Sequence, residues 1–344
     1  MKYYDGTKLL SLLDVNGNKP ELYFAVGNRS GGKTTYFNRM LVNRFKKRGE
    51  KFLLLYRWGY ELTGVADKFF KDIGELFFKD DTMTEIAMAK GKYVELRLND
   101  EVCGYAVCLN SANMVKKLSH LFNDVSCILF DEFMSEDGAY CPNEIDKFQS
   151  VHMSVSRGRG QPVRYVPVFL ISNTVTLLNP YFVELGISYR LQEDTKYLRG
   201  DGYVVECFFN EEVKNAQERS GFNRAFANSR YQRYSATNIY LNDNNTFVEN
   251  LSGQNKYLAT VVYKGVKYAI RRYDELGVMY CDKRIDESFP VRISATQDDH
   301  TMNYVMLESY GLFLSQLRMI FNRGLFRFKD LSCKECIMSI IGIC

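Results

Sequence analysis

The feature that most constrains this chain is a glycine-rich segment between two apolar stretches. Residues 27–34 read Gly-Asn-Arg-Ser-Gly-Gly-Lys-Thr and match G-x-x-x-x-G-K-[ST] at every fixed position. The apolar run 21–26 predicts a buried strand, and residues 33–48 have apolar positions spaced like one helix face. Such a loop binds phosphate because its backbone N–H groups and the helix N-terminus converge. We therefore predict a nucleotide site formed by Gly27, Asn28, Arg29, Ser30, Gly31, Gly32, Lys33, Thr34 and Thr35.

A pair of acids follows a second apolar strand. Residues 125–130 are apolar apart from Ser126 and lead directly to Asp131 and Glu132. Asp131 is expected to hold Mg²⁺ together with the Thr34 hydroxyl, and Glu132 to polarise the attacking water as general base. Paired acids after a strand also occur as a solvated helix start. With the phosphate loop upstream, the pair favours an ATPase with a dedicated catalytic glutamate over kinases and small GTPases, and hence ATP and Mg²⁺ as cofactors.

Four further polar residues are candidates for contacts with the nucleotide. Asn173 ends an apolar strand, where it is either a γ-phosphate sensor or a turn residue. Arg29 lies inside the phosphate loop and is placed to touch the γ-phosphate of its own subunit. Arg157 and Arg159 lie on a glycine-flanked loop, and Arg157 is the stronger candidate for an arginine finger that reaches a neighbour's nucleotide. A solvated basic loop, or a contact to nucleic-acid phosphate, is the alternative.

The order of elements predicts an α/β fold for the first part of the chain. Further strands are expected at 51–57, 125–130 and 167–172, a hairpin at 92–109 and a helix at 142–156. Strands that alternate with helices form a mainly parallel sheet covered on both faces.

The pattern changes after about residue 200. Residues 210–233 are polar and helix-like, three apolar runs at 257–263, 266–272 and 278–282 predict an antiparallel meander, and a helix is expected at 303–323. We predict an ATPase domain at 1–197, a helical linker at 198–244 and a C-terminal domain at 245–344.

Composition restricts the function classes only weakly. The 344 residues carry a net charge of +4, which permits a nucleic-acid partner without requiring one. The N-terminal residues are polar and no apolar run is long enough to span a bilayer, so we expect no membrane association. Nine scattered cysteines favour buried thiols in a reducing compartment. Cys333 and Cys336 have the spacing of a metal pair, but no second pair or nearby histidine completes a zinc site.

Taken in order, the motifs resemble those of the DNA-packaging ATPases (encapsidation proteins) of phi29-type tailed bacteriophages, small relatives of the large terminase subunits. The resemblance rests on the phosphate loop with its arginine and on short motifs that span nearly the whole chain. They are Tyr56-Arg57, Glu61-Leu62, residues 129–133, Pro142-Asn143-Glu144, residues 156–159, Ile171-Ser172-Asn173, residues 178–182, 262–265, 277–280 and 324–328.

This resemblance implies an ATP-driven motor that moves double-stranded DNA into a preformed procapsid through the portal (connector). It implies a homo-oligomeric ring, with a pentamer as the expected form, that acts in the host cytoplasm at the portal vertex and is absent from the mature virion. Arg157 is then expected to act in trans. Whether a structural packaging RNA joins the ring stays open.

The resemblance also implies a P-loop ASCE ATPase domain followed by a small α+β domain with the RNase H-like fold. A nuclease of that fold needs carboxylates on its first strand, and 257–263 has none. We therefore predict a degenerate nuclease domain that serves as a docking or DNA-guiding module. Candidate DNA contacts are Lys46, Lys47, Arg48, Arg224, Arg230 and Arg233, each of which is equally explained as a solubilising charge.

Two other readings stay open. One is a hexameric helicase or a DNA pump of chromosome-segregation type, and strand unwinding would distinguish the helicase from a packaging motor. A nucleotide-gated DNA-binding switch binds ATP with little turnover, although Glu132 argues against it.

Overall fold

The computed structural model describes residues 3–136, 138–158, 160, 162–177, 179–188, 190–191, 195–225 and 247–341. The chain divides into two compact units. The first contains Met1–Thr176 and Gln192–Asn242, and the second Leu177–Leu191 and Asp243–Cys344.

The first unit is built on one large sheet, in which nine strands are found among the described residues. Its order is β3-β4-β5-β2-β6-β7-β1-β9-β8. The strands are β1 (Leu22–Gly27), β2 (Lys51–Tyr56), β3 (Met83–Met88), β4 (Tyr93–Leu98), β5 (Glu101–Cys108), β6 (Val125–Asp131), β7 (Val168–Asn173), β8 (Tyr197–Gly200) and β9 (Tyr203–Phe208).

The six central strands, from β5 to β9, pair in parallel, as the continuous apolar runs predict. Strand β7 lies between β1 and β6, so one strand separates the phosphate-loop strand from the strand that ends in Asp131. That order is the arrangement of the predicted ASCE class of P-loop ATPases. Because the strands are parallel, their carboxyl ends share one edge of the sheet, where ligands bind in open α/β folds.

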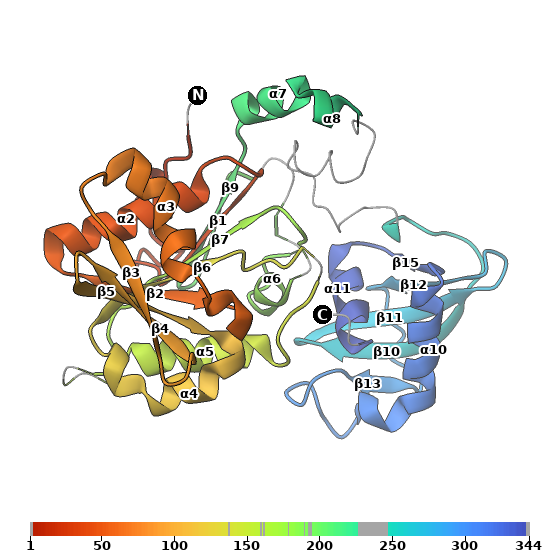
Figure 1. Ribbon diagram of the computed structural model, residues 1–344. Helices are drawn as coiled ribbons and strands as arrows, with labels where there is room; N and C mark the ends of the chain where they lie inside the picture. Colours follow the sequence, from red (N-terminus) through yellow and green to blue (C-terminus); the bar gives the residue numbers. More distant parts are fainter. Residues whose placement is uncertain are drawn as a thin grey trace. The chain divides into compact units, whose positions relative to one another are not determined.

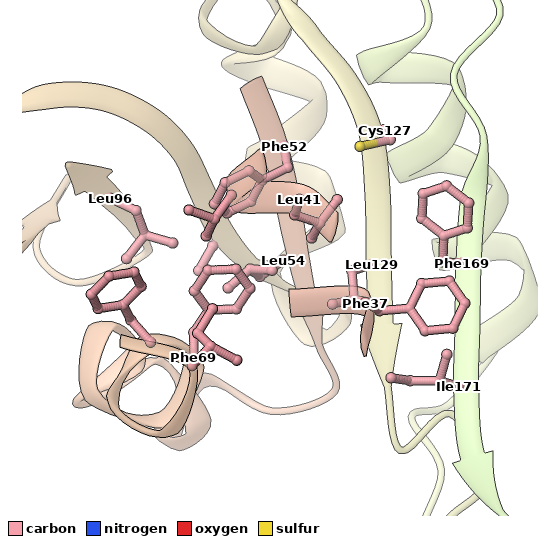
Figure 2. Close-up of a cluster of buried hydrophobic side chains, with 14 of the residues drawn as sticks. Phe37, Leu41, Phe52, Leu54, Phe69, Leu96, Cys127, Leu129, Phe169 and Ile171 are labelled. Carbon is pink, nitrogen blue, oxygen red and sulfur yellow. The ribbon is translucent and has the colours of Figure 1, made fainter. Parts of the chain in front are cut away.

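Helices cover both faces of this sheet. Figure 1 shows α2 and α3 on one side and α4 and α5 on the other. On the first side, Phe37 and Leu41 of α2 and Phe69 of α3 pack against Leu54 and Leu129 of the sheet (Figure 2). All five are buried, and the burial of each side chain contributes about 1.5–3 kcal/mol to the stability of the fold. The helices of this unit are α1 (Thr7–Ser11), α2 (Lys33–Arg48), α3 (Val65–Phe77), α4 (Ala112–Lys117), α5 (Glu144–Val155), α7 (Glu211–Arg219) and α8 (Gly221–Ala225).

The predicted elements of this unit are present. The hairpin forms between β4 and β5, and its turn residues Asn99 and Asp100 have positive φ values of 49° and 67°. This left-handed pair is typical of the two-residue turns that match strand twist. The edge strand β3 and helix α3 were not predicted.

The predicted linker at 198–244 begins too early. Strand β9 pairs in parallel with β1, and β8 pairs antiparallel with β9, so both belong to the first sheet. They read as linker because the β8–β9 hairpin is short and follows a polar stretch. Within the described residues, the helical part of the segment starts with α7.

The second unit contains a six-stranded sheet of order β14-β13-β10-β11-β12-β15 among its described residues. Strands β10, β11 and β12 form the predicted antiparallel meander, and β13 and β14 continue the sheet parallel to β10. This is the strand order expected of an RNase H-like sheet, with β15 added beside β12. The strands are β10 (Lys256–Tyr263), β11 (Val266–Tyr273), β12 (Val278–Asp282), β13 (Arg292–Ser294), β14 (Val305–Met306) and β15 (Phe326–Phe328).

One face of this sheet packs against two helices. Leu317 of α10 (Gly311–Asn322) and Ile337 of α11 (Leu331–Ile340) are buried in the same cluster as Val261 and Ile270. The short helix α6 (Pro180–Glu184) also belongs to this unit. The helix predicted at 303–323 is shorter, because β14 and a 3-10 turn occupy 305–310.

In the part of the chain that is described, no helix is long and apolar enough to cross a bilayer. Cys333 and Cys336 are buried on α11, and no group of three potential metal ligands is found among the described residues.

Candidate active site

The phosphate loop lies at the carboxyl edge of the first sheet. Strand β1 ends at Gly27, which is level with Asn173 of β7 and with Phe208 of β9. A Cβ atom at position 27 would lie 2.2 Å from the carbonyl oxygen of Phe208, so only glycine fits. Gly32 has φ +92°, a left-handed conformation, and α2 begins at the next residue. The two glycines thus let the loop turn tightly from strand to helix, as predicted.

Lys33 is folded into the loop. Its side chain is buried, and Nζ donates hydrogen bonds to the carbonyl oxygens of Gly27 (3.1 Å) and Asn28 (2.9 Å). Burial lowers the pKa of Lys33 to about 8, although the charge of Asp131 acts in the opposite direction. The ammonium is thus poorly solvated, and a phosphate would be a better partner than two neutral carbonyls.

The predicted metal ligands meet. The Oγ1 atom of Thr34 donates a 2.8 Å hydrogen bond to Oδ2 of Asp131, across 97 positions of sequence. Burial raises the pKa of Asp131 to about 6, and the charge of Glu132 adds to this, while the bond from Thr34 opposes it. A carboxylate that burial destabilises in this way is well suited to bind a cation.

Glu132 follows with an unusual backbone. Its φ of 57° is left-handed, which is uncommon for a residue with a side chain, and its N–H donates to Oδ1 of Asp131 at 2.9 Å. The side chain is exposed at a cavity of about 360 Å³. Thr34, Asn38, Tyr56, Glu61, Lys68, Asp131 and Glu132 are among the residues that line this cavity. Tyr56 and Lys68 had no predicted role, because neither lies in a motif with known phosphate chemistry.

The other predicted nucleotide contacts, Arg29 and Asn173, lie at the phosphate loop, and Arg157 does not. Arg29 is half-exposed and its NH1 atom lies 3.6 Å from Oε1 of Glu136. Asn173 is level with Gly27 on the neighbouring strand, and its role as a sensor stays a prediction. Arg157 is exposed just after α5, and the adjacent Gly158 packs on Asn123, which precedes the start of β6. Arg157 therefore lies at the amino ends of the strands, whereas Asp131 lies at their carboxyl ends. The length of β6 separates Arg157 from the site of its own chain by roughly 20 Å.

The sequence did not predict one contact between the phosphate loop and α7. The amide of Asn28 donates to the carbonyl of Asn210 at 3.1 Å and accepts from its N–H at 3.0 Å. The Oδ1 atom of Asn210 accepts in turn from the N–H groups of Glu212 and Val213 and caps α7. Both asparagines are buried, so the loop and the start of α7 are joined.

The candidate DNA contacts on α2 lie apart from this site. Lys46 pairs with Asp81, and Nε of Arg48 lies 3.2 Å from Glu50, at the end of α2 distant from the phosphate loop. Lys47 is exposed in the same turn, and Arg224 is exposed on α8. Arg230 and Arg233, like Arg159, lie outside the described residues.

Comparisons with known proteins agree with the motifs. The model of a family described as podovirus DNA encapsidation protein (Gp16) matches residues 2–341. The DNA packaging protein of Bacillus phage phi29 is 26% identical over 332 residues, which are 95% of this chain and 93% of the relative.

Two solved structures share the fold over almost the whole chain. A chain of the bacteriophage phi29 viral genome packaging motor assembly aligns with a TM-score of 0.64 at 24% identity, covering 98% of this chain and 99% of that one. A chain of the Phi-28 gp11 DNA packaging motor aligns with a TM-score of 0.66 at 18% identity, covering 98% of both.

Proposed function

Because this chain belongs to the podovirus DNA encapsidation protein (Gp16) family, we propose that it is an ATP-hydrolysing motor that translocates double-stranded viral DNA into a preformed procapsid. One observation carries the proposal. Thr34 of the phosphate loop contacts Asp131, and Glu132 follows directly at the same sheet edge. Residues suited to bind and to cleave a nucleotide therefore lie beside one cavity.

The side chains fit ATP and Mg²⁺. The Thr34 hydroxyl and the Asp131 carboxylate are the oxygen donors that Mg²⁺ prefers, and the raised pKa of Asp131 reflects a buried carboxylate that a cation would stabilise. Bound Mg²⁺ supplies charge neutralisation on the β- and γ-phosphates. The Lys33 ammonium exchanges the Gly27 and Asn28 carbonyls for phosphate oxygens.

Glu132 acts as general base. Its carboxylate takes a proton from the attacking water while the water oxygen bonds to the γ-phosphorus and the bond from that phosphorus to the bridging oxygen breaks. The exposed position of Glu132 at the cavity leaves room for the water. Arg29 within the loop and Asn173 beside Gly27 bind the γ-phosphate of the same subunit.

Arg157 serves the nucleotide of a neighbouring subunit. Its place at the opposite edge of the sheet argues against a role in its own site, and its exposure after α5 suits a trans-acting finger. Mixing Glu132→Gln chains with Arg157→Ala chains tests this assignment. Interfaces that pair the intact Glu132 of one chain with the intact Arg157 of another should restore part of the ATPase rate, and mixtures as inactive as either parent would contradict it.

The partners follow from the family. We propose a homo-oligomeric ring, pentameric in its simplest form, that binds double-stranded DNA and the portal (connector) at the procapsid vertex in the host cytoplasm and leaves before the virion matures. Lys46, Lys47, Arg48 and Arg224 are proposed DNA contacts. A structural packaging RNA is a further candidate member of this assembly.

The second unit serves as a docking or DNA-guiding module without nuclease activity. Strand β10 carries no carboxylate. The buried Asp282 at the end of β12 is committed to Arg271 (3.3 Å) and Arg284 (2.8 Å). A carboxylate neutralised by two guanidinium groups is a poor metal ligand.

The test is the steady-state ATPase rate with Mg²⁺, with and without double-stranded DNA, for the wild type and Glu132→Gln. We expect a rate that duplex DNA raises and that the substitution abolishes. Nucleotide binding without turnover in the wild type would favour the switch, and ATP-dependent strand separation would favour the helicase.

A further inference from the structure

A buried arginine lies beside Glu132 and was not assigned a role. Arg57 follows the last residue of β2, and Glu132 follows the last residue of β6. The two strands are parallel neighbours in register at Leu55 and Phe130, so their carboxyl ends lie side by side. The Arg57 side chain is only 8% exposed, which is rare for an arginine and requires partners for its charge.

The backbone around Glu132 supplies one set of partners. The NH1 atom of Arg57 donates to the carbonyl oxygen of Glu132 (3.3 Å), and NH2 donates to that of Phe133 (2.7 Å). One planar group therefore holds two successive peptide carbonyls. These are the peptides that follow the left-handed φ of Glu132, a conformation that persists only where its surroundings enforce it.

Glu144 supplies the other set. Its carboxylate is 1% exposed and accepts from Nε of Arg57 at 3.0 and 3.2 Å and from NH2 at 3.1 Å. The N–H of Cys141 also donates to Glu144 at 2.7 Å. The guanidinium lies against the rings of Phe130 (5.4 Å) and Tyr140 (5.0 Å), so its plane is fixed as well as its charge.

We propose that Arg57, oriented by Glu144, is a positioning residue that sets the direction in which the Glu132 side chain leaves the backbone. This inference rests on the proposed role of Glu132 as general base. The guanidinium is needed because its fork donates at once to Glu144 and to two carbonyls, whereas a lysine ammonium is a single point charge on a flexible stem. Among the described residues, the Arg57 guanidinium bonds to the backbone at Glu132 and Phe133 and to Glu144, and not to Lys33 or Thr34. We therefore expect hydrolysis to depend on Arg57 and nucleotide binding to be independent of it.

Arg57→Lys in the full-length chain is the test, with kcat and the dissociation constant of a non-hydrolysable ATP analogue measured together. We expect kcat to fall about 100-fold, the scale of a 1 Å misplacement, and the dissociation constant to change by less than about twofold. The same substitution in a Glu132→Gln background should change the residual rate by less than about threefold, because the group that Arg57 positions is then already lost. Arg97→Lys, at a more exposed Arg–Glu pair on β4, is the matched control and should leave kcat unchanged.

Three outcomes would overturn the proposal. They are an unchanged kcat in Arg57→Lys, a loss of analogue binding as large as the loss of rate, or a fall in kcat that is as large in the Glu132→Gln background as in the wild type. If Arg57→Lys does not fold, Glu144→Gln carries the same test, because it keeps the shape of the partner and removes its charge. The proposed function itself would be refuted if the wild type hydrolysed no ATP or if the Glu132→Gln variant were fully active. The ATPase rates of these two proteins therefore distinguish a failure of the proposed function from a failure of the role proposed for Arg57.

Discussion

Asp131→Asn should make the nucleotide-free protein more stable while it abolishes ATP hydrolysis. In the folded protein burial raises the pKa of Asp131 from 3.8 to about 6. Above pH 6 the carboxylate is charged in both the folded and the unfolded chain, and the folded state bears the cost of the buried charge. Asparagine removes that charge with almost no change in shape.

The magnitude follows from the pKa. A rise of about 2 units corresponds to roughly 3 kcal/mol, which we reduce to about 1–3 kcal/mol because Asp131 is not fully buried. The two hydrogen bonds survive the substitution. The carbonyl oxygen of the new amide still accepts from the N–H of Glu132, and its nitrogen donates to the Thr34 hydroxyl, which changes from donor to acceptor.

The dependence on pH separates this effect from a general gain in packing. The cost is absent below about pH 4, where Asp131 is protonated in both states, and it develops as pH rises to about 6. Thermal unfolding of the first unit, followed without nucleotide or Mg²⁺ at pH 4 and pH 7.5, should show the variant more stable by several degrees at pH 7.5 only.

A control with the opposite sign is available. The ion pair with Lys46 lowers the pKa of Asp81, so Asp81→Asn should not stabilise the protein at pH 7.5. An Asp131→Asn variant that is less stable than the wild type at pH 7.5, or equally shifted at both pH values, would refute the reasoning.

Three further predictions concern the loop, its link to α7 and the second unit. Because the pKa of Lys33 is about 8, the affinity for an ATP analogue should fall above pH 8 as the ammonium is neutralised. An affinity that does not change up to pH 9.5 would contradict this. Asn210→Ala removes the side-chain oxygen that caps α7 at the N–H groups of Glu212 and Val213 and should cost about 0.5–2 kcal/mol in denaturant unfolding. Asn16→Ala, which removes an exposed bond to Asp201, should cost less. Duplex DNA incubated with the protein and Mg²⁺ or Mn²⁺ should stay uncut. Specific cleavage would contradict the prediction that the second unit lacks nuclease activity.

Much of the site was predictable because its chemistry is local. The phosphate loop needs glycine at fixed positions between a strand and a helix, and Gly27, Gly32 and Lys33 occupy the positions that the pattern requires. The central strands were also predictable, because strands that are buried on both faces of a sheet consist of continuous apolar runs. The contact of Thr34 with Asp131 followed from a further rule, that parallel strands end at one sheet edge.

Some elements were missed or misplaced. Strand β9 carries an apolar run at 203–205 after a Gly-Asp-Gly turn at 200–202, but the polar residues before β8 favoured a linker. Pairing of β9 with β1 and of β8 with β9 places both strands in the first sheet. Strand β14, which shortens the helix expected at 303–323, likewise forms by pairing with β13. Pairing with another segment decides whether such residues form a strand. The propensities of the residues within a short window of sequence do not predict that pairing.

The sequence by itself determined which residues form the phosphate-loop motif, which acids follow a strand and which class of fold can present them. Only the tertiary structure decided what those residues touch. It placed Arg57 under the backbone of Glu132, joined Asn28 to Asn210, and put Arg157 at the far edge of the sheet. The physical reason is that a motif specifies the conformation of a few consecutive residues. The burial, charge partners and direction of each side chain depend instead on strand neighbours that lie tens to hundreds of residues away.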